Sequence, residues 1–73
     1  MGRLRPVKSS AVIKILTTHY GYTYIGTKGS HAHFKDASGH KTTIPLYHEL
    51  YPKMIKLILH DTDLDWDDIE KHL

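Results

Sequence analysis

The spacing of apolar residues along the chain changes from a helical period to an alternating one and back again. Near the start, apolar residues recur at intervals that place them on one helical face: Ala11, Val12, Ile15 and Leu16. Ser9 or Ser10 is suited to cap this helix, and Gly21 is typical of the position after a helix end. This pattern predicts a first helix over about residues 10–20.

From Tyr22 onward, apolar and polar residues alternate, which predicts β-strands. Turn signals at Lys28-Gly29-Ser30 and at residues 36–39 separate the alternating segments. The predicted strands are residues 22–25, ending at Gly26, then 31–35, and then 40–44, closed by Pro45. Three short strands joined by tight turns indicate an antiparallel meander.

The last third of the chain predicts two more helices. Pro52 suits the first turn of a helix, and an apolar face follows that would cover one side of the meander: Met54, Ile55, Leu57, Ile58 and Leu59. A short final helix is expected to start at Asp65 and to dock through Ile69 and Leu73. The order α-β-β-β-α predicts an α+β fold, with a three-stranded antiparallel sheet and helices on one face.

Length and composition restrict the classes of protein. A chain of 73 residues buries only about 60% of its surface. We therefore expect one domain over residues 1–73, with residues 1–7 as a flexible N-terminal extension, and no deep cleft between two lobes. The absence of cysteine excludes disulfides, thiolate zinc sites and cysteine nucleophiles. No apolar stretch has the length of a signal peptide or a membrane span, which indicates a soluble cytoplasmic protein without a membrane partner.

Charge is distributed unevenly although the net charge is only +2. Residues 1–60 hold nine lysines and arginines against Asp36 and Glu49, whereas residues 61–73 hold six acidic residues against Lys71. A basic body favours a polyanionic partner, so nucleic acid is the first partner class to consider. Part of the acidic tail is explained by the capping of the last helix.

Two of the seven histidines share a predicted strand. Because side chains alternate along a strand, His31 and His33 lie on one face while Ala32 and Phe34 face the core. Imidazole takes up or gives up a proton near neutral pH, and RNA cleavage needs a base at the 2′-hydroxyl and an acid at the leaving 5′-oxygen. Lys28 would supply a cation for the phosphate, and Gly29 permits close approach of the backbone.

Three interpretations of this pair remain open. The histidines form an exposed hairpin face without a task, or a metal pair completed by His48 or Asp36, or part of a ribonuclease site. His19, His60 and His72 lie near predicted helix ends, where we expect them to have a structural role. We expect His40, beside a turn, to be a simply exposed polar residue.

Several motifs occur in an order that is known from one family. They are Val7-Lys8-Ser9-Ser10 before a helix, Gly21-Tyr22 at the first strand, Lys28-Gly29-Ser30-His31 followed by Phe34, the turn from Asp36 to Gly39, and Pro45 with His48 after the third strand. Over about residues 7–70 the chain resembles the HicA family of toxin mRNA interferases. The Gly-Ser-His turn with basic and aromatic flanks is the most specific of these elements.

The resemblance implies a fold like the double-stranded-RNA-binding domain and a toxin that cleaves or otherwise inactivates mRNA, neutralised by a HicB-type antitoxin. We expect the toxin to cleave RNA without a metal or other cofactor. The resemblance places the catalytic histidine at His31. It also implies that Lys28, Gly29 and Ser30 hold the RNA backbone, and it aligns His33 with a position where members often carry another histidine. A non-catalytic double-stranded-RNA-binding module is the alternative.

Two segments depart from the family pattern. Residues 46–52 are aromatic and stiff where the family has a basic Lys/Gly/Thr-rich segment. Asp63 stands where a glycine commonly ends the second helix, although aspartate tolerates the left-handed conformation better than most residues. We expect these differences to alter substrate contacts more than the fold.

Overall fold

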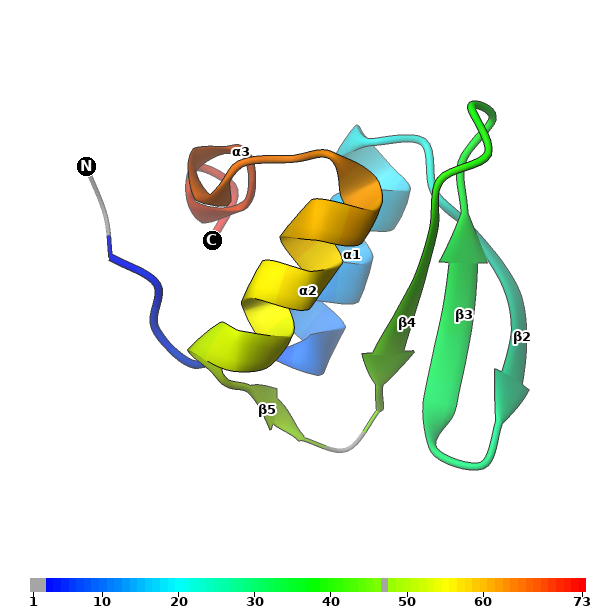
Figure 1. The fold of residues 1–73 in the computed structure, drawn as a ribbon, viewed down its shortest axis with the longest axis horizontal. Helices are drawn as coiled ribbons and strands as arrows, with labels where there is room; N and C mark the ends of the chain where they lie inside the picture. The colour runs from blue at the N-terminus through cyan, green and yellow to red at the C-terminus, as the bar shows by residue number, and fades with distance from the viewer. Residues whose placement is uncertain (1–2, 47) are drawn as a thin grey trace.

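Three antiparallel strands form the sheet in the computed structural model, which describes residues 3–46 and 48–73 (Figure 1). The strand order is β2-β3-β4, and the chain runs through the elements β1 (Val7–Lys8), α1 (Ser9–His19), β2 (Thr23–Lys28), β3 (His31–Lys35), β4 (Lys41–Pro45), β5 (Glu49–Leu50), α2 (Pro52–Thr62) and α3 (Trp66–Glu70). The predicted α+β class and the central α-β-β-β-α order are confirmed.

Both long helices lie on the same side of the sheet (Figure 1). The core between these layers consists of Val7, Val12, Ile15, Leu16, Tyr22, Ala32, Phe34, Ile44, Leu50, Ile55, Ile58 and Ile69. Since side chains alternate along β3, burial of Ala32 and Phe34 directs His31 and His33 to the opposite side. We call this uncovered side of the sheet the open face.

A second, two-stranded sheet pairs the residues before α1 with the residues before α2. In it, Val7 is paired with Leu50 and Lys8 with Glu49, and both apolar members are buried. The sequence did not predict this pairing because two residues are too short to show an alternating pattern. Within the expected extension over residues 1–7, Val7 thus belongs to β1, and the Arg5 guanidinium lies 2.7 Å from the Glu70 carboxylate. Residues 1 and 2 lie outside the described residues, and the mobility of the extension stays a prediction.

The predicted cap of the first helix is wrong. Lys8 occupies the N-cap position and Ser9 is already the first helical residue. The Ser9 side chain is instead buried and donates a hydrogen bond of 2.9 Å to the Leu46 carbonyl, so a tertiary contact replaces the local cap.

Three smaller predictions also need correction. The first strand does not end at Gly26, because a β-bulge between Tyr24 and Gly26 lets it continue to Lys28. Leu57 lies on the exposed side of α2 and Leu73 is exposed at the chain end, so neither belongs to the core. The rest of the predicted apolar face of α2 is buried or half-buried.

The last helix packs beside the end of α1. Its expected start is confirmed, since Asp65 is the N-cap and its amide donates to the Asp68 carboxylate at 2.8 Å. Following α3, the His72 ring stacks on His19 with ring centroids 3.7 Å apart. Desolvation lowers the pKa of His72, and the charges of His19 and Lys71 lower it further. In the described part of the chain, no helix is both long and apolar enough to cross a membrane.

Asp63 ends α2 in the left-handed conformation, with φ 56° and ψ 35°. This confirms the left-handed conformation expected for Asp63. The Asp63→Gly variant should be more stable to urea by about 0.5–1 kcal/mol, because glycine adopts positive φ without a steric penalty. The matched Asp61→Gly variant, inside α2, should be less stable to urea by about 0.3 kcal/mol. Equal effects of the two substitutions would contradict this explanation.

Tyr22 is buried beneath the acidic end of α2, and no described residue hydrogen-bonds its hydroxyl. Burial, followed by the charges of Asp36, Asp61 and Asp63, raises its pKa to about 12. The unfolded chain loses the phenol proton near pH 10 while the folded protein keeps it, so stability should fall as the pH rises from 10 to 12. Urea unfolding measured at pH 9 and at pH 11 should show a smaller decrease in the free energy of unfolding for Tyr22→Phe than for the wild type. Equal losses would refute the assignment.

Candidate functional site

The hairpin between β2 and β3 brings the candidate residues together. Lys28 pairs with His31 across a two-residue turn made of Gly29 and Ser30. Gly29 has φ +62°, and it alone of the two turn residues has a positive φ. Positive φ at the first turn residue only is the pattern of a type II′ turn, which twists with the strands and favours glycine at this position. The order Lys-Gly-Ser-His therefore fits the turn geometry.

His31 lies in a row across the sheet between Lys28 on β2 and Pro45 on β4. Residues directly opposite each other on antiparallel strands share a face, and their Cβ atoms lie about 4.5–5.5 Å apart. Both His31 and Lys28 are exposed. In the described part of the chain no residue hydrogen-bonds the His31 ring, so its nitrogens are available to a ligand beside the Lys28 ammonium.

His33 lies in the next row, between Gly26 and Thr43. Its Nδ1 is 2.9 Å from the Thr43 hydroxyl oxygen, and the ring is half-buried. Gly26 has no side chain and sits at φ +144° in the β-bulge, so β2 does not cover the ring. The structure thus fixes the orientation of His33 while it leaves His31 free.

The turn is anchored to the rest of the fold through Leu46. The Leu46 amide donates a hydrogen bond of 2.8 Å to the Ser30 carbonyl, and the Leu46 carbonyl accepts the one from Ser9. The Ser9 amide also donates to the His48 carbonyl at 3.3 Å. These bonds connect the turn to the start of α1 and to the segment that leads into β5.

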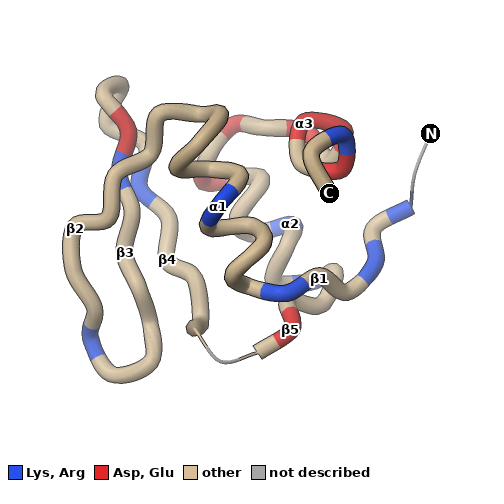
Figure 2. Tube along the Cα trace, turned by 180° about the vertical axis from the view of Figure 1, so that it is seen from behind, with Lys and Arg blue, Asp and Glu red and all other residues tan. Residues whose placement is uncertain are grey.

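The open face is basic. Lys35 and Lys41 pair with each other at its other end, where Asp36 accepts hydrogen bonds from the His40 backbone at 2.8 Å and from its ring at 2.9 Å. Burial raises the pKa of Asp36, but these bonds outweigh it and hold the pKa below its usual value. Figure 2 shows that most other acidic residues gather at α3 and the end of α2, away from the β2–β3 turn. His40 is therefore a structural partner of Asp36 as well as a surface residue.

The metal interpretation has no third ligand in the structure. Among residues 3–46 and 48–73, no three His, Asp or Glu side chains lie close enough together to hold one ion. His31 and His33 are thus not joined by His48 or Asp36 into such a group.

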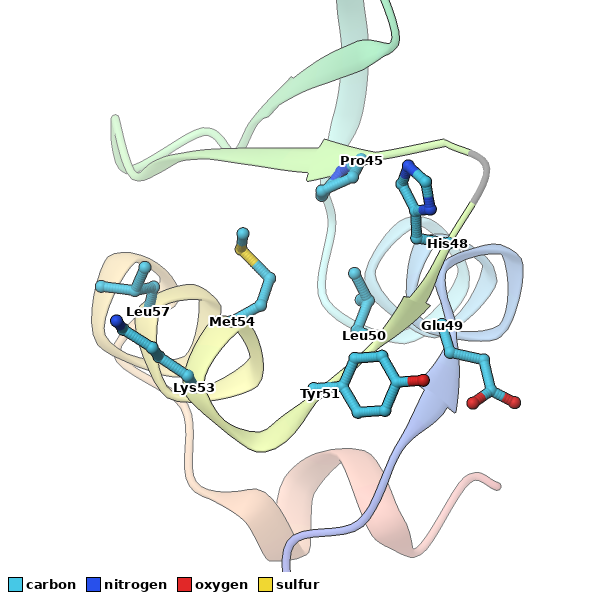
Figure 3. A pocket seen from close by; sticks show the side chains of 8 residues that line it. All are labelled: Pro45, His48, Glu49, Leu50, Tyr51, Lys53, Met54 and Leu57. Carbon is cyan, nitrogen blue, oxygen red and sulfur yellow. The ribbon is translucent and has the colours of Figure 1, made fainter.

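An apolar pocket of about 350 Å³ adjoins the hairpin row at Pro45 (Figure 3). It lies between the end of β4, β5 and the first turns of α2, and sequence reasoning did not find it. The composition of residues 46–52 was the available signal, but a contribution from α2 cannot be read from that segment alone. Tyr47, in the segment 46–52, lies outside the described residues.

These features define a small α+β protein with helices on one face of its sheet and a basic, histidine-bearing hairpin on the other. The family model for the HicA toxin of bacterial toxin–antitoxin systems matches residues 9–64, and the chain belongs to this family. The match begins with α1, contains the hairpin and ends just before α3. No curated protein matches the sequence.

Proposed function

We propose that this toxin is an endoribonuclease that cleaves mRNA through His31. Membership of the HicA family supports a toxin. The observation that supports the assignment most is the exposed His31 ring on the open face, directly opposite Lys28 across a two-residue turn. The alternating burial along β3 makes this exposure a consequence of the fold.

RNA cleavage within the chain needs proton transfer at two oxygens. The 2′-oxygen bonds to phosphorus and gives up its proton, while the bond from phosphorus to the 5′-oxygen breaks and that oxygen gains a proton. His31 would accept the first proton or donate the second. One positioned group contributes about 10²–10⁴-fold to such a rate, so we expect a slow enzyme. Imidazole performs this transfer without a metal ion, and we propose a metal-independent reaction.

The other turn residues would hold the RNA backbone. The Lys28 ammonium would lie against a phosphate, and the Ser30 hydroxyl would donate a hydrogen bond to a phosphate oxygen. Gly29, which has no side chain, would let the RNA backbone approach the turn. His33, held by Thr43, would contact the same RNA strand one row away. Contacts of this kind release counterions, so binding should weaken steeply with salt.

The proposed partners are mRNA in the cytoplasm and a HicB-type antitoxin. An antitoxin that covers the open face would exclude RNA from His31. The test is production of the protein in a bacterium. Wild type should arrest growth with accumulation of mRNA fragments, the His31→Ala variant should do neither, and co-production of the cognate antitoxin should restore growth. Arrest by His31→Ala at equal protein levels would refute the proposal.

A non-catalytic RNA-binding module is the second candidate, because the α-β-β-β-α order and basic face also suit duplex RNA. It predicts tight, salt-dependent binding of duplex RNA and no cleavage products. A gel-shift titration on duplex and single-stranded RNA, run beside a cleavage gel, separates the two functions.

A further inference from the structure

The apolar pocket beside the hairpin has no role in the function described so far. Pro45, Leu50, Met54 and Leu57 contribute its apolar walls, and the Tyr51 ring stands at its mouth (Figure 3). Tyr51 is 60% exposed and Leu57 55% exposed, so both present apolar surface to solvent beside the pocket. Pockets of about 300–1,000 Å³ bind small molecules, so a cavity of about 350 Å³ has room for one planar ring system.

The pocket reaches the strand partner of the candidate catalytic residue, although no described residue of the hairpin lines it. Pro45 lines the pocket and also lies directly opposite His31 in the strand register. Paired residues of antiparallel strands have their Cα atoms about 4.5–5.5 Å apart. The hydrogen bond from the Leu46 amide to the Ser30 carbonyl further ties the turn to the segment that forms the pocket. An RNA chain with one phosphate at His31 would therefore bring its neighbouring nucleotide to this cavity.

The charges around the pocket suit a polyanion. His48 lies beside Pro45 on one side, and Lys53 stands on α2 on the other (Figure 3). Glu49, the one acidic residue among the described lining residues, directs its carboxylate away from the hollow (Figure 3). The apolar interior is thus flanked by the Lys53 ammonium, which attracts phosphates, and by the His48 imidazole, which can hydrogen-bond one.

We propose that this pocket binds one unpaired nucleobase of the RNA, stacked on Tyr51, next to the phosphate at which His31 transfers a proton. The inference rests on the proposed function. Every base has a flat apolar face that stacks on an aromatic ring. A base in a duplex is already paired and stacked, and drawing it into a pocket costs free energy. The toxin should therefore prefer single-stranded RNA, which the fold alone does not predict.

The test uses the His31→Ala variant, which keeps the RNA intact, and short single-stranded RNAs with the fluorescent base 2-aminopurine at each position in turn. We expect quenching at one position only, and a Tyr51→Ala substitution in the same background should remove it and weaken binding by about 5- to 100-fold. Tyr51→Phe should retain both signals because it retains the ring. Since the Tyr51 side chain is exposed, thermal unfolding should be unchanged in both variants.

Two matched controls separate the pocket from the general surface. Tyr24→Ala removes another exposed tyrosine, outside the pocket, and should leave the quenching in place. Lys53→Gln should weaken binding more than Lys56→Gln, because Lys53 lines the pocket and Lys56 does not.

The inference and the proposed function fail in different ways. Unchanged affinity and quenching in Tyr51→Ala, or tighter binding of duplex than of single-stranded RNA, would overturn the base pocket even if wild type cleaves RNA. The cavity would then suit an apolar side chain of a protein partner. Tyr51-dependent quenching without any cleavage by the wild type would support the pocket and refute the ribonuclease.

Discussion

Replacement of His31 by alanine should slow RNA cleavage about 100- to 10,000-fold, which is the typical contribution of one proton-transfer group. The imidazole is exposed on the open face and packs into no core, so the variant should unfold at the wild-type temperature. A single-turnover time course on a labelled single-stranded RNA, with enzyme in excess, measures the chemical step directly.

His60→Ala is the matched control for this prediction. His60 is also exposed, but it lies in the last turn of α2 and is absent from the hairpin. The His60→Ala variant should cleave RNA at the wild-type rate. A His31→Ala variant as fast as His60→Ala would show that the proton transfer resides elsewhere.

Replacement of Ile44 by alanine should have the largest effect on stability. Ile44 is fully buried on β4, facing the helices, and truncation of a buried isoleucine costs about 2–5 kcal/mol. That is a large share of the about 5–15 kcal/mol that stabilises a typical domain. In a chain of this size each kcal/mol shifts the midpoint by about 4–8 °C, so thermal unfolding should begin far below the wild-type range.

Ile25→Ala is the control in the same sheet. Ile25 is 53% exposed on β2, and its truncation should change stability by no more than about 0.5 kcal/mol. Similar losses for the two isoleucines would mean that the faces of the sheet are wrongly assigned. Such a result would also remove the argument for the exposure of His31. Ile44 pairs with Ala32, and Ala32 follows His31 along β3 and faces the opposite side of the sheet.

The hairpin was predictable because its information is local. Gly29 defines the turn, and alternation from His31 to Phe34 defines which side chains face solvent. Both signals lie within a few residues, and the structure places Lys28, His31 and His33 on one face as expected. Their roles in RNA cleavage stay predictions, since position on a face does not show chemistry.

Features that depend on distant residues were not predictable. Ser9 gave the signal of a helix cap, but its hydroxyl binds Leu46, 37 residues along the chain. The pairing of Val7 with Leu50 likewise joins segments without periodicity of their own. The pocket combines Pro45 on β4 with Met54 on α2, and the packing of α2 against β4 brings the two together.

Incubation of the purified protein with single-stranded RNA in excess EDTA distinguishes a metal-independent ribonuclease from an RNA-binding module. Wild type should give discrete cleavage products in EDTA, and the RNA should stay intact with the His31→Ala variant. Intact RNA with both proteins, while both still bind it in a gel shift, would refute cleavage through His31 and favour the RNA-binding module.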